Sequence, residues 1–280
     1  MKSYAYVRRL TLSFLLLAGS FSHLPAWANS EAEIARYRAQ LQEGNPGELW
    51  EMQGEELWKK KNGPKQVSLE SCDLGKGPGV LKGAYAELPR YFSDVGKVMD
   101  LEARLIHCMK TLQGVDTAVY MNLGEKKKGS GAFNAKGPGS DIAAIATYIA
   151  VQSAGMKFNV DAREPHVAAA RQTGDDLFWR RSGPFDFACA TCHAESGKRI
   201  RLQVLGDITT AEGAAGAVTT WPAYRVSQGI VRTLQHRMWD CYWQMRHPDV
   251  DYTSDAVTAL LTYLAVQANG SEIKAPYIKR

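Results

Sequence analysis

The sequence has little of several features that mark common protein classes. It contains five cysteines in 280 residues, and only Cys189 and Cys192 have the C-x-x-C spacing of a metal or redox pair. No second metal-spaced pair of cysteines or histidines lies near them, which argues against a four-ligand zinc site. The formal net charge of +5 is too small for the basic balance of a nucleic-acid-binding protein. No segment after residue 28 is long and apolar enough to cross a membrane.

A histidine follows the C-x-x-C pair directly, so residues 189–193 read Cys-Ala-Thr-Cys-His. This is the attachment motif of a c-type haem. The two thiols add across the haem vinyl groups as thioethers, and the adjacent histidine ligates the iron. The motif therefore predicts one covalent haem c on Cys189 and Cys192, with His193 as the proximal ligand. A plain C-x-x-C redox or zinc pair is the alternative.

The first 28 residues have the pattern of a secretory signal peptide. Lys2, Arg8 and Arg9 precede an apolar run over residues 10–18, and Ala-Trp-Ala at 26–28 forms a small-residue cleavage site. The apolar run is too short to span a bilayer. We therefore expect a signal peptide over residues 1–28 and a periplasmic protein, and the periplasm is where c-type haem is attached.

The rest of the chain repeats itself. Residues 54–64 align without gaps on residues 174–184. The same register places residues 69–73 on the C-x-x-C-H motif, with Cys72 as the one remaining thiol and Asp73 in place of the ligand histidine. We therefore expect the first copy to bind no haem.

Two further blocks extend the repeat. Residues 88–108 match residues 221–241, and residues 147–152 match residues 262–267. In the first of these pairs, both blocks carry an arginine followed four residues later by a cysteine. These residues are Arg104 and Cys108 in one block, and Arg237 and Cys241 in the other. The change of register between the blocks indicates an insertion after Cys108, which includes an exposed loop at residues 125–131.

The two copies predict a mostly α protein of two tandem cytochrome c-like domains. Apolar residues recur at helical spacing in four segments that lack internal proline: 90–112, 140–154, 225–246 and 254–268. We expect a domain without haem over residues 29–158 and a haem-binding domain over residues 159–280.

Cys241 is the residue that we expect opposite His193, because a thiolate is a good iron ligand. Four neighbours are rivals for that position: Met238, Met245, His236 and His247. The methionines fit a core equally well, the histidines fit structural roles, and a cysteine on an apolar helix face is often simply buried. Cys72 and Cys108 could approach each other in a half without haem, which would leave Cys241 unpaired in an oxidising compartment.

Arg237 lies one helical turn before Cys241. An arginine on a helix is usually a solvated charge, but this one recurs as Arg104 before the matching cysteine. Its guanidinium is always ionised and presents a planar set of donors, which suits an anionic substrate. The pattern favours Arg237 as a substrate-binding residue.

The combination of residues 189–193, 221–224 and 237–241 resembles the SoxA family, c-type cytochromes of the periplasmic sulfur-oxidation pathway. The resemblance covers essentially the whole chain after residue 28. It is closest to the single-haem form, because Leu69 and Asp73 depart from the two-haem pattern.

The resemblance implies a pairing with the smaller haem protein SoxX and an L-cysteine S-thiosulfotransferase activity. Thiosulfate would be joined oxidatively to a cysteine of the carrier SoxYZ, with two electrons leaving through haem. It also implies roles for individual residues: Cys189 and Cys192 would hold the haem and His193 would be its proximal ligand. Cys241 would be the distal ligand and catalytic sulfur, as a persulfide, and Arg237 would bind thiosulfate. The resemblance further suggests a disulfide between Cys72 and Cys108.

The main alternative is a periplasmic electron-transfer cytochrome c without catalysis of its own. In that case Cys241 or a nearby methionine would only tune the haem potential. A two-haem peroxidase is disfavoured because the chain has one C-x-x-C-H motif. A binding subunit with a purely structural haem is a more remote alternative.

Overall fold

The computed structural model describes residues 26–117, 138–200, 203–248 and 252–279. Most of the predicted signal peptide 1–28 and all of the predicted loop 125–131 lie outside these residues. None of the described helices combines the length and apolarity needed to cross a membrane. The described α-helices are α1 (Ala26–Glu43), α2 (Gly47–Lys59), α3 (Leu101–Cys108), α5 (Pro138–Val151), α6 (Pro165–Trp179), α7 (Cys189–His193), α8 (Ala211–Val218), α9 (Leu234–Gln244) and α10 (Asp255–Gln267).

The contacts divide the chain into two units, Met1–Gln40 and Leu41–Arg280. The described part of the first unit consists of most of helix α1. The second unit contains both copies of the repeat. The fold is mostly helical, as the sequence predicts, and it also contains short strands that the sequence analysis does not predict.

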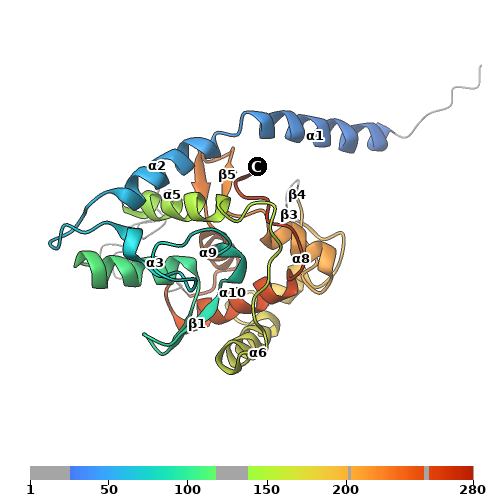
Figure 1. Ribbon diagram of the computed structural model, residues 1–280. Helices are drawn as coiled ribbons and strands as arrows, with labels where there is room; N and C mark the ends of the chain where they lie inside the picture. The colour runs from blue at the N-terminus through green and yellow to red at the C-terminus, as the bar shows by residue number, and fades with distance from the viewer. Residues whose placement is uncertain (1–25, 118–137, 201–202, 249–251, 280) are drawn as a thin grey trace, which may run out of the picture. The chain divides into compact units, whose positions relative to one another are not determined.

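Each copy is built around one crossing pair of helices, α2 with α5 and α6 with α10 (Figure 1). A glycine lies at each crossing. A Cβ atom on Gly54 would come within 2.1 Å of the Ala144 carbonyl oxygen, and one on Gly174 would come within 2.1 Å of the Ala259 carbonyl oxygen. Only glycine therefore permits these helices to approach so closely. This close approach explains why the repeated segments 54–64 and 174–184 both begin with glycine.

The predicted helices over residues 140–154 and 254–268 are confirmed within a few residues by α5 and α10. The prediction of unbroken helices over 90–112 and 225–246 is wrong, because each of these segments begins with an antiparallel β-hairpin. The hairpin strands are β1 (Arg90–Phe92) and β2 (Lys97–Met99) in the first copy, and β5 (Ala223–Arg225) and β6 (Ile230–Arg232) in the second.

Glycine and capping residues explain this break. Gly96 and Gly229 adopt φ values of +71° and +66° between the paired strands, a conformation that favours glycine. The helices then begin at N-cap residues whose side chains accept backbone hydrogen bonds, Asp100 before α3 and Thr233 before α9. Helix α3 continues into a π-helical turn, η3 (Met109–Gln113). Apolar spacing alone does not reveal a hairpin that leads into a helix.

The remaining elements are short. Strands β3 (Arg199–Ile200) and β4 (Gln203–Val204) form a small hairpin, and β7 (Tyr277–Lys279) pairs in parallel with β5. Two single turns of 3-10 helix, η1 (Leu69–Ser71) and η2 (Tyr85–Glu87), lie in the first copy. One apolar cluster surrounds α2, α3 and α5, and a second surrounds α6, α9 and α10, with Cys189 and Tyr242 packed against it.

Candidate functional site

The C-x-x-C-H motif forms the short helix α7. The backbone N–H of Ala188 donates a hydrogen bond of 3.0 Å to the Thr191 hydroxyl, which holds the first turn in place. Cys189 and Cys192 are both free thiols and both partly buried. The two thiols and His193 therefore all lie on this one short helix.

His193 is oriented by a contact from outside the motif. Its Nδ1 atom lies 2.9 Å from the carbonyl oxygen of Gly206. Because a carbonyl can only accept, Nδ1 carries the proton and Nε2 keeps its lone pair for a metal. Burial, the main cause, lowers the pKa of His193 below its usual range, which also favours the neutral ring. A neutral, oriented imidazole next to two free thiols fits a c-type haem.

Cys241 projects from α9 toward the same region. Burial is the main cause that raises the pKa of Cys189 to about 12, and the neighbouring Cys241 and Cys192 raise it further. Burial likewise raises the pKa of Cys241, while the guanidinium groups of Arg237 and Arg225 oppose that shift. Three sulfur atoms and two positive charges therefore influence one another here. Burial disfavours the thiolate of Cys241, and the two nearby cations reduce that cost.

The four rivals of Cys241 each have identifiable surroundings. Met238 is 8% exposed and belongs to the second apolar cluster. His236 is buried, and burial lowers its pKa to about 3. His247 Nδ1 lies 2.8 Å from the Ser182 hydroxyl oxygen, and Met245 caps the C-terminal end of α9.

Arg237 does not face solvent as an isolated charge. Its side chain is 18% exposed and forms an ion pair with Asp240, one turn further along α9. The guanidinium lowers the pKa of Cys241, and the Asp240 carboxylate raises it. Arg237 and Cys241, predicted as partners from the repeat, are thus brought together with Asp240.

Arg225 is a residue that the sequence analysis missed. It is the last residue of β5, is partly buried, and influences the pKa of Cys241. The repeat could have revealed this residue, because the alignment of residues 88–108 with residues 221–241 places Arg225 at the position of Phe92. An arginine that replaces an aromatic core residue is a reason to look for an anion.

The first copy uses the corresponding positions in another way. Cys72 and Cys108 form a disulfide, with their sulfur atoms 2.03 Å apart. In the repeat, these positions correspond to Cys192 and Cys241, which are free thiols. The sulfur groups that the second copy leaves free are therefore bonded to each other in the first.

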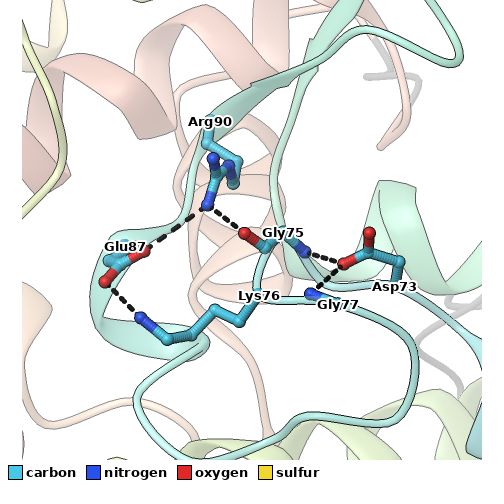
Figure 2. A network of polar contacts seen from close by, with 6 residues as sticks. All are labelled: Asp73, Gly75, Lys76, Gly77, Glu87 and Arg90. Atoms are coloured by element: carbon cyan, nitrogen blue, oxygen red, sulfur yellow. Dashed lines mark hydrogen bonds and ion pairs between the residues drawn. The ribbon is translucent and has the colours of Figure 1, made fainter.

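Asp73, the counterpart of His193, also has a structural role (Figure 2). Its carboxylate accepts backbone hydrogen bonds from Gly75 at 2.6 Å and from Gly77 at 2.9 Å. Arg90 donates to the Gly75 carbonyl oxygen at 2.5 Å and also contacts Glu87. These contacts hold the loop in place, so the Asp73 carboxylate has a structural role here.

Comparisons with known proteins agree with this site. A family model described as the SoxA/TsdA cytochrome c domain matches residues 53–158 and 173–273. The L-cysteine S-thiosulfotransferase subunit SoxA of Hydrogenophilus thermoluteolus is 45% identical over 275 residues, which cover 96% of this chain and 97% of the relative. The chain belongs to the SoxA family. A cytochrome c domain implies a haem c, which the free thiols of α7 and the oriented His193 fit.

Other relatives give the same result. A SoxA subunit of Hydrogenobacter thermophilus is 35% identical over 82% of this chain and 81% of its own length. The crystal structure of SoxXA from P. pantotrophus superposes with a TM-score of 0.70 at 24% identity, and the match covers 88% of this chain and 84% of that chain. Membership of the SoxA family thus extends over the described fold.

Proposed function

We propose that this chain is the SoxA-type subunit of a periplasmic L-cysteine S-thiosulfotransferase. It would join thiosulfate to a cysteine of the carrier SoxYZ, and would act as a heterodimer with the haem subunit SoxX. The observation that carries this proposal is Cys241, a free and partly buried cysteine. Its pKa responds to two guanidinium groups and to the Cys192 thiol, and Cys241 in turn raises the pKa of Cys189. A cytochrome that only carries electrons needs no such arrangement around its distal residue.

The proposal includes one haem and two tandem cytochrome c-like domains, over residues 29–158 and 159–280. Cys189 and Cys192 would hold the haem, and His193 and Cys241 would be its axial ligands. The first domain would hold none, because Cys72 is bonded to Cys108 and an aspartate stands in place of the histidine. Residues 1–28 would direct the chain to the periplasm and be removed.

The haem would supply a one-electron acceptor and would pass on, one at a time, the two electrons that the reaction releases. The carrier thiol loses its proton, and a bond forms between its sulfur atom and the terminal sulfur of thiosulfate. Cys241, as a persulfide, would first bond through its outer sulfur to the terminal sulfur of thiosulfate, with loss of two electrons. It would leave again as a persulfide when the carrier thiolate attacks that terminal sulfur. Arg237 would offset the repulsion between the anionic sulfur species. Its position beside Cys241 supports this role.

The test is turnover of the Cys241→Ala variant, purified with its haem and with SoxX. We expect thiosulfate-dependent electron release in the presence of SoxYZ to be lost, while the haem stays attached. The double variant Cys72→Ala/Cys108→Ala is the matched control. It also removes sulfur atoms, but neither of these cysteines has a role in the proposed reaction, so turnover should be kept. Turnover retained by Cys241→Ala would favour the electron-transfer cytochrome instead.

A second measurement is the mass of the proteolytic peptide that contains Cys241, from protein matured in a haem-attaching periplasm. We expect one added sulfur atom, as a persulfide requires. An unmodified thiol in freshly purified, active protein would contradict the persulfide role.

A further inference from the structure

Arg225 has a buried donor for which the described structure supplies no acceptor. It closes strand β5 opposite Ile230 of β6. Its Nε atom is covered from solvent, and no residue in the described part of the chain accepts a hydrogen bond from it. Leaving a buried donor of a charged group unsatisfied is costly, and the cost is higher than for a neutral group. A ligand with an acceptor oxygen or sulfur would remove this cost.

The repeat indicates which residue lies near Arg225. Its counterpart in the first copy is Phe92, and the counterpart of Arg237 is Arg104. There, the guanidinium carbon of Arg104 lies 4.1 Å from the centre of the Phe92 ring. In the first copy, these two backbone positions therefore bring their side chains into contact. In the second copy, both of these positions carry a positive charge, and after burial the charge of Arg237 is the largest influence on the pKa of Arg225.

The balance of charge differs between the two copies. In the first, Arg104 pairs with Asp94 at 2.8 Å and stacks on an uncharged ring. In the second, Arg237 pairs with Asp240, and the residue that corresponds to Asp94 is Ser227. Within the described ranges, no carboxylate forms an ion pair with Arg225. Two guanidinium groups and one carboxylate thus leave one positive charge, and both guanidinium groups influence Cys241.

We propose that Arg225 is a further substrate-binding residue, which together with Arg237 binds the thiosulfate anion. This inference rests on the proposed function and names a second residue of the same site. Asp240 already compensates one of the two guanidinium charges, so a bound anion compensates the second charge and supplies the acceptor that the Nε atom of Arg225 lacks.

A carboxylate of the haem could offer the same chemistry to Arg225. The substrate is favoured because Arg225 and Arg237 both act on the Cys241 sulfur, which is the atom where thiosulfate would react. The two sources make different predictions. A residue that binds substrate controls KM, whereas a residue that binds a haem carboxylate controls the potential of the haem and its dependence on pH.

The experiment compares Arg225→Gln with the natural chain, each carrying haem and paired with SoxX. Glutamine keeps an N–H donor at the distance of the arginine Nε atom from the backbone and removes the positive charge. We expect KM for thiosulfate to rise about ten- to a hundred-fold, the effect of losing a charge-assisted hydrogen bond. Competitive inhibition by sulfate should weaken by a similar factor. Arg225→Lys should restore part of the loss, because it restores the charge without the planar set of donors.

Arg232→Gln is the matched control. Arg232 lies in the same hairpin, and its Nε atom already donates to Gln228 at 2.8 Å. Its replacement should leave KM nearly unchanged. An equal rise of KM in both variants would show a general effect of surface charge and would overturn the proposal.

The other outcomes separate this inference from the proposed function. An unchanged KM in Arg225→Gln, with turnover still dependent on Cys241, would overturn the role of Arg225 and leave the function standing. An unchanged KM with an altered pH dependence of the haem potential would assign Arg225 to a haem carboxylate. If the natural chain shows no thiosulfate turnover, calorimetric titration with sodium sulfate decides: binding lost in Arg225→Gln supports the anion site, and equal binding overturns it.

Discussion

The amide of Gln235, in the second copy of the repeat, donates a hydrogen bond of 2.6 Å to the buried carboxylate of Asp100 in the first copy. Thr258 of α10 donates to the other oxygen of the same carboxylate at 2.9 Å. Asp100 also caps α3 through the backbone N–H of Ala103. The start of one helix is therefore tied to the other half of the molecule through a single carboxylate.

Replacing Gln235 with leucine should destabilise the protein, because the buried carboxylate of Asp100 loses one of its donors while the volume of the side chain is nearly kept. We expect the free energy of unfolding to fall by about 1.5–3 kcal/mol, the range for hydrogen bonds to charged groups. Urea unfolding of the haem-loaded protein measures this change. Gln228→Leu, at an exposed position in the β5–β6 turn, should change it by less than about 0.5 kcal/mol.

Glu102 makes the stability of the same interface depend on pH. Burial, followed by the charge of Asp100, raises the pKa of Glu102 from 4.5 to about 8, although a hydrogen bond with Thr233 opposes the shift. The folded protein thus keeps a proton that the unfolded chain has released between these two values. Stability is therefore expected to fall as the pH rises from about 4.5 to about 8.

The variant Glu102→Gln should remove this part of the pH dependence. The difference in unfolding free energy between Glu102→Gln and the natural chain should grow with pH by up to about 1.4 kcal/mol per pH unit within that window. Unfolding curves at a series of pH values measure it. Parallel profiles for the two proteins would show that Glu102 is ionised in the folded state.

The disulfide between Cys72 and Cys108 should stabilise the first copy without affecting the haem. It closes a loop between residues separated by 36 positions, so Cys72→Ser should lower the free energy of unfolding by about 2–4 kcal/mol. The haem content, measured by absorbance, should not change. Equal stability of the variant and the natural chain would mean that the two cysteines are not bonded in the mature protein.

Much of this site was accessible from sequence because its chemistry depends on short spacings. The motif at residues 189–193 is typical of haem c attachment. The repeat links Arg237 to Cys241 through their counterparts Arg104 and Cys108. Asp240 and Gly206 could not be found in this way. One is an ordinary helix residue, and the other contributes only a backbone carbonyl that the fold brings to His193.

The errors in the predicted secondary structure also arise from contacts that short sequence patterns do not reveal. The segments before α3 and α9 have apolar residues at helical spacing, but their backbone hydrogen bonds go to a hairpin partner instead of along a helix. The pairing between Asp100 and Gln235 joins residues 135 positions apart. Such contacts depend on how the two copies pack, which local periodicity does not encode.

The crossing of α6 and α10 supplies the last prediction. A Cβ atom on Gly174 would lie 2.1 Å from the carbonyl oxygen of Ala259 and 2.7 Å from its carbon, and backbone atoms cannot move aside as a flexible side chain can. We expect Gly174→Ala to force the helices apart and to lower the free energy of unfolding by about 3 kcal/mol, at the upper end of overpacking effects. Gly216→Ala in α8 is the control, since nothing lies within 4 Å of its Cβ position, and alanine should there stabilise the helix by about 0.5–1 kcal/mol. Thermal unfolding and haem content measure both variants, and a Gly174→Ala protein as stable as the natural chain would show that close helix contact at this glycine is not needed.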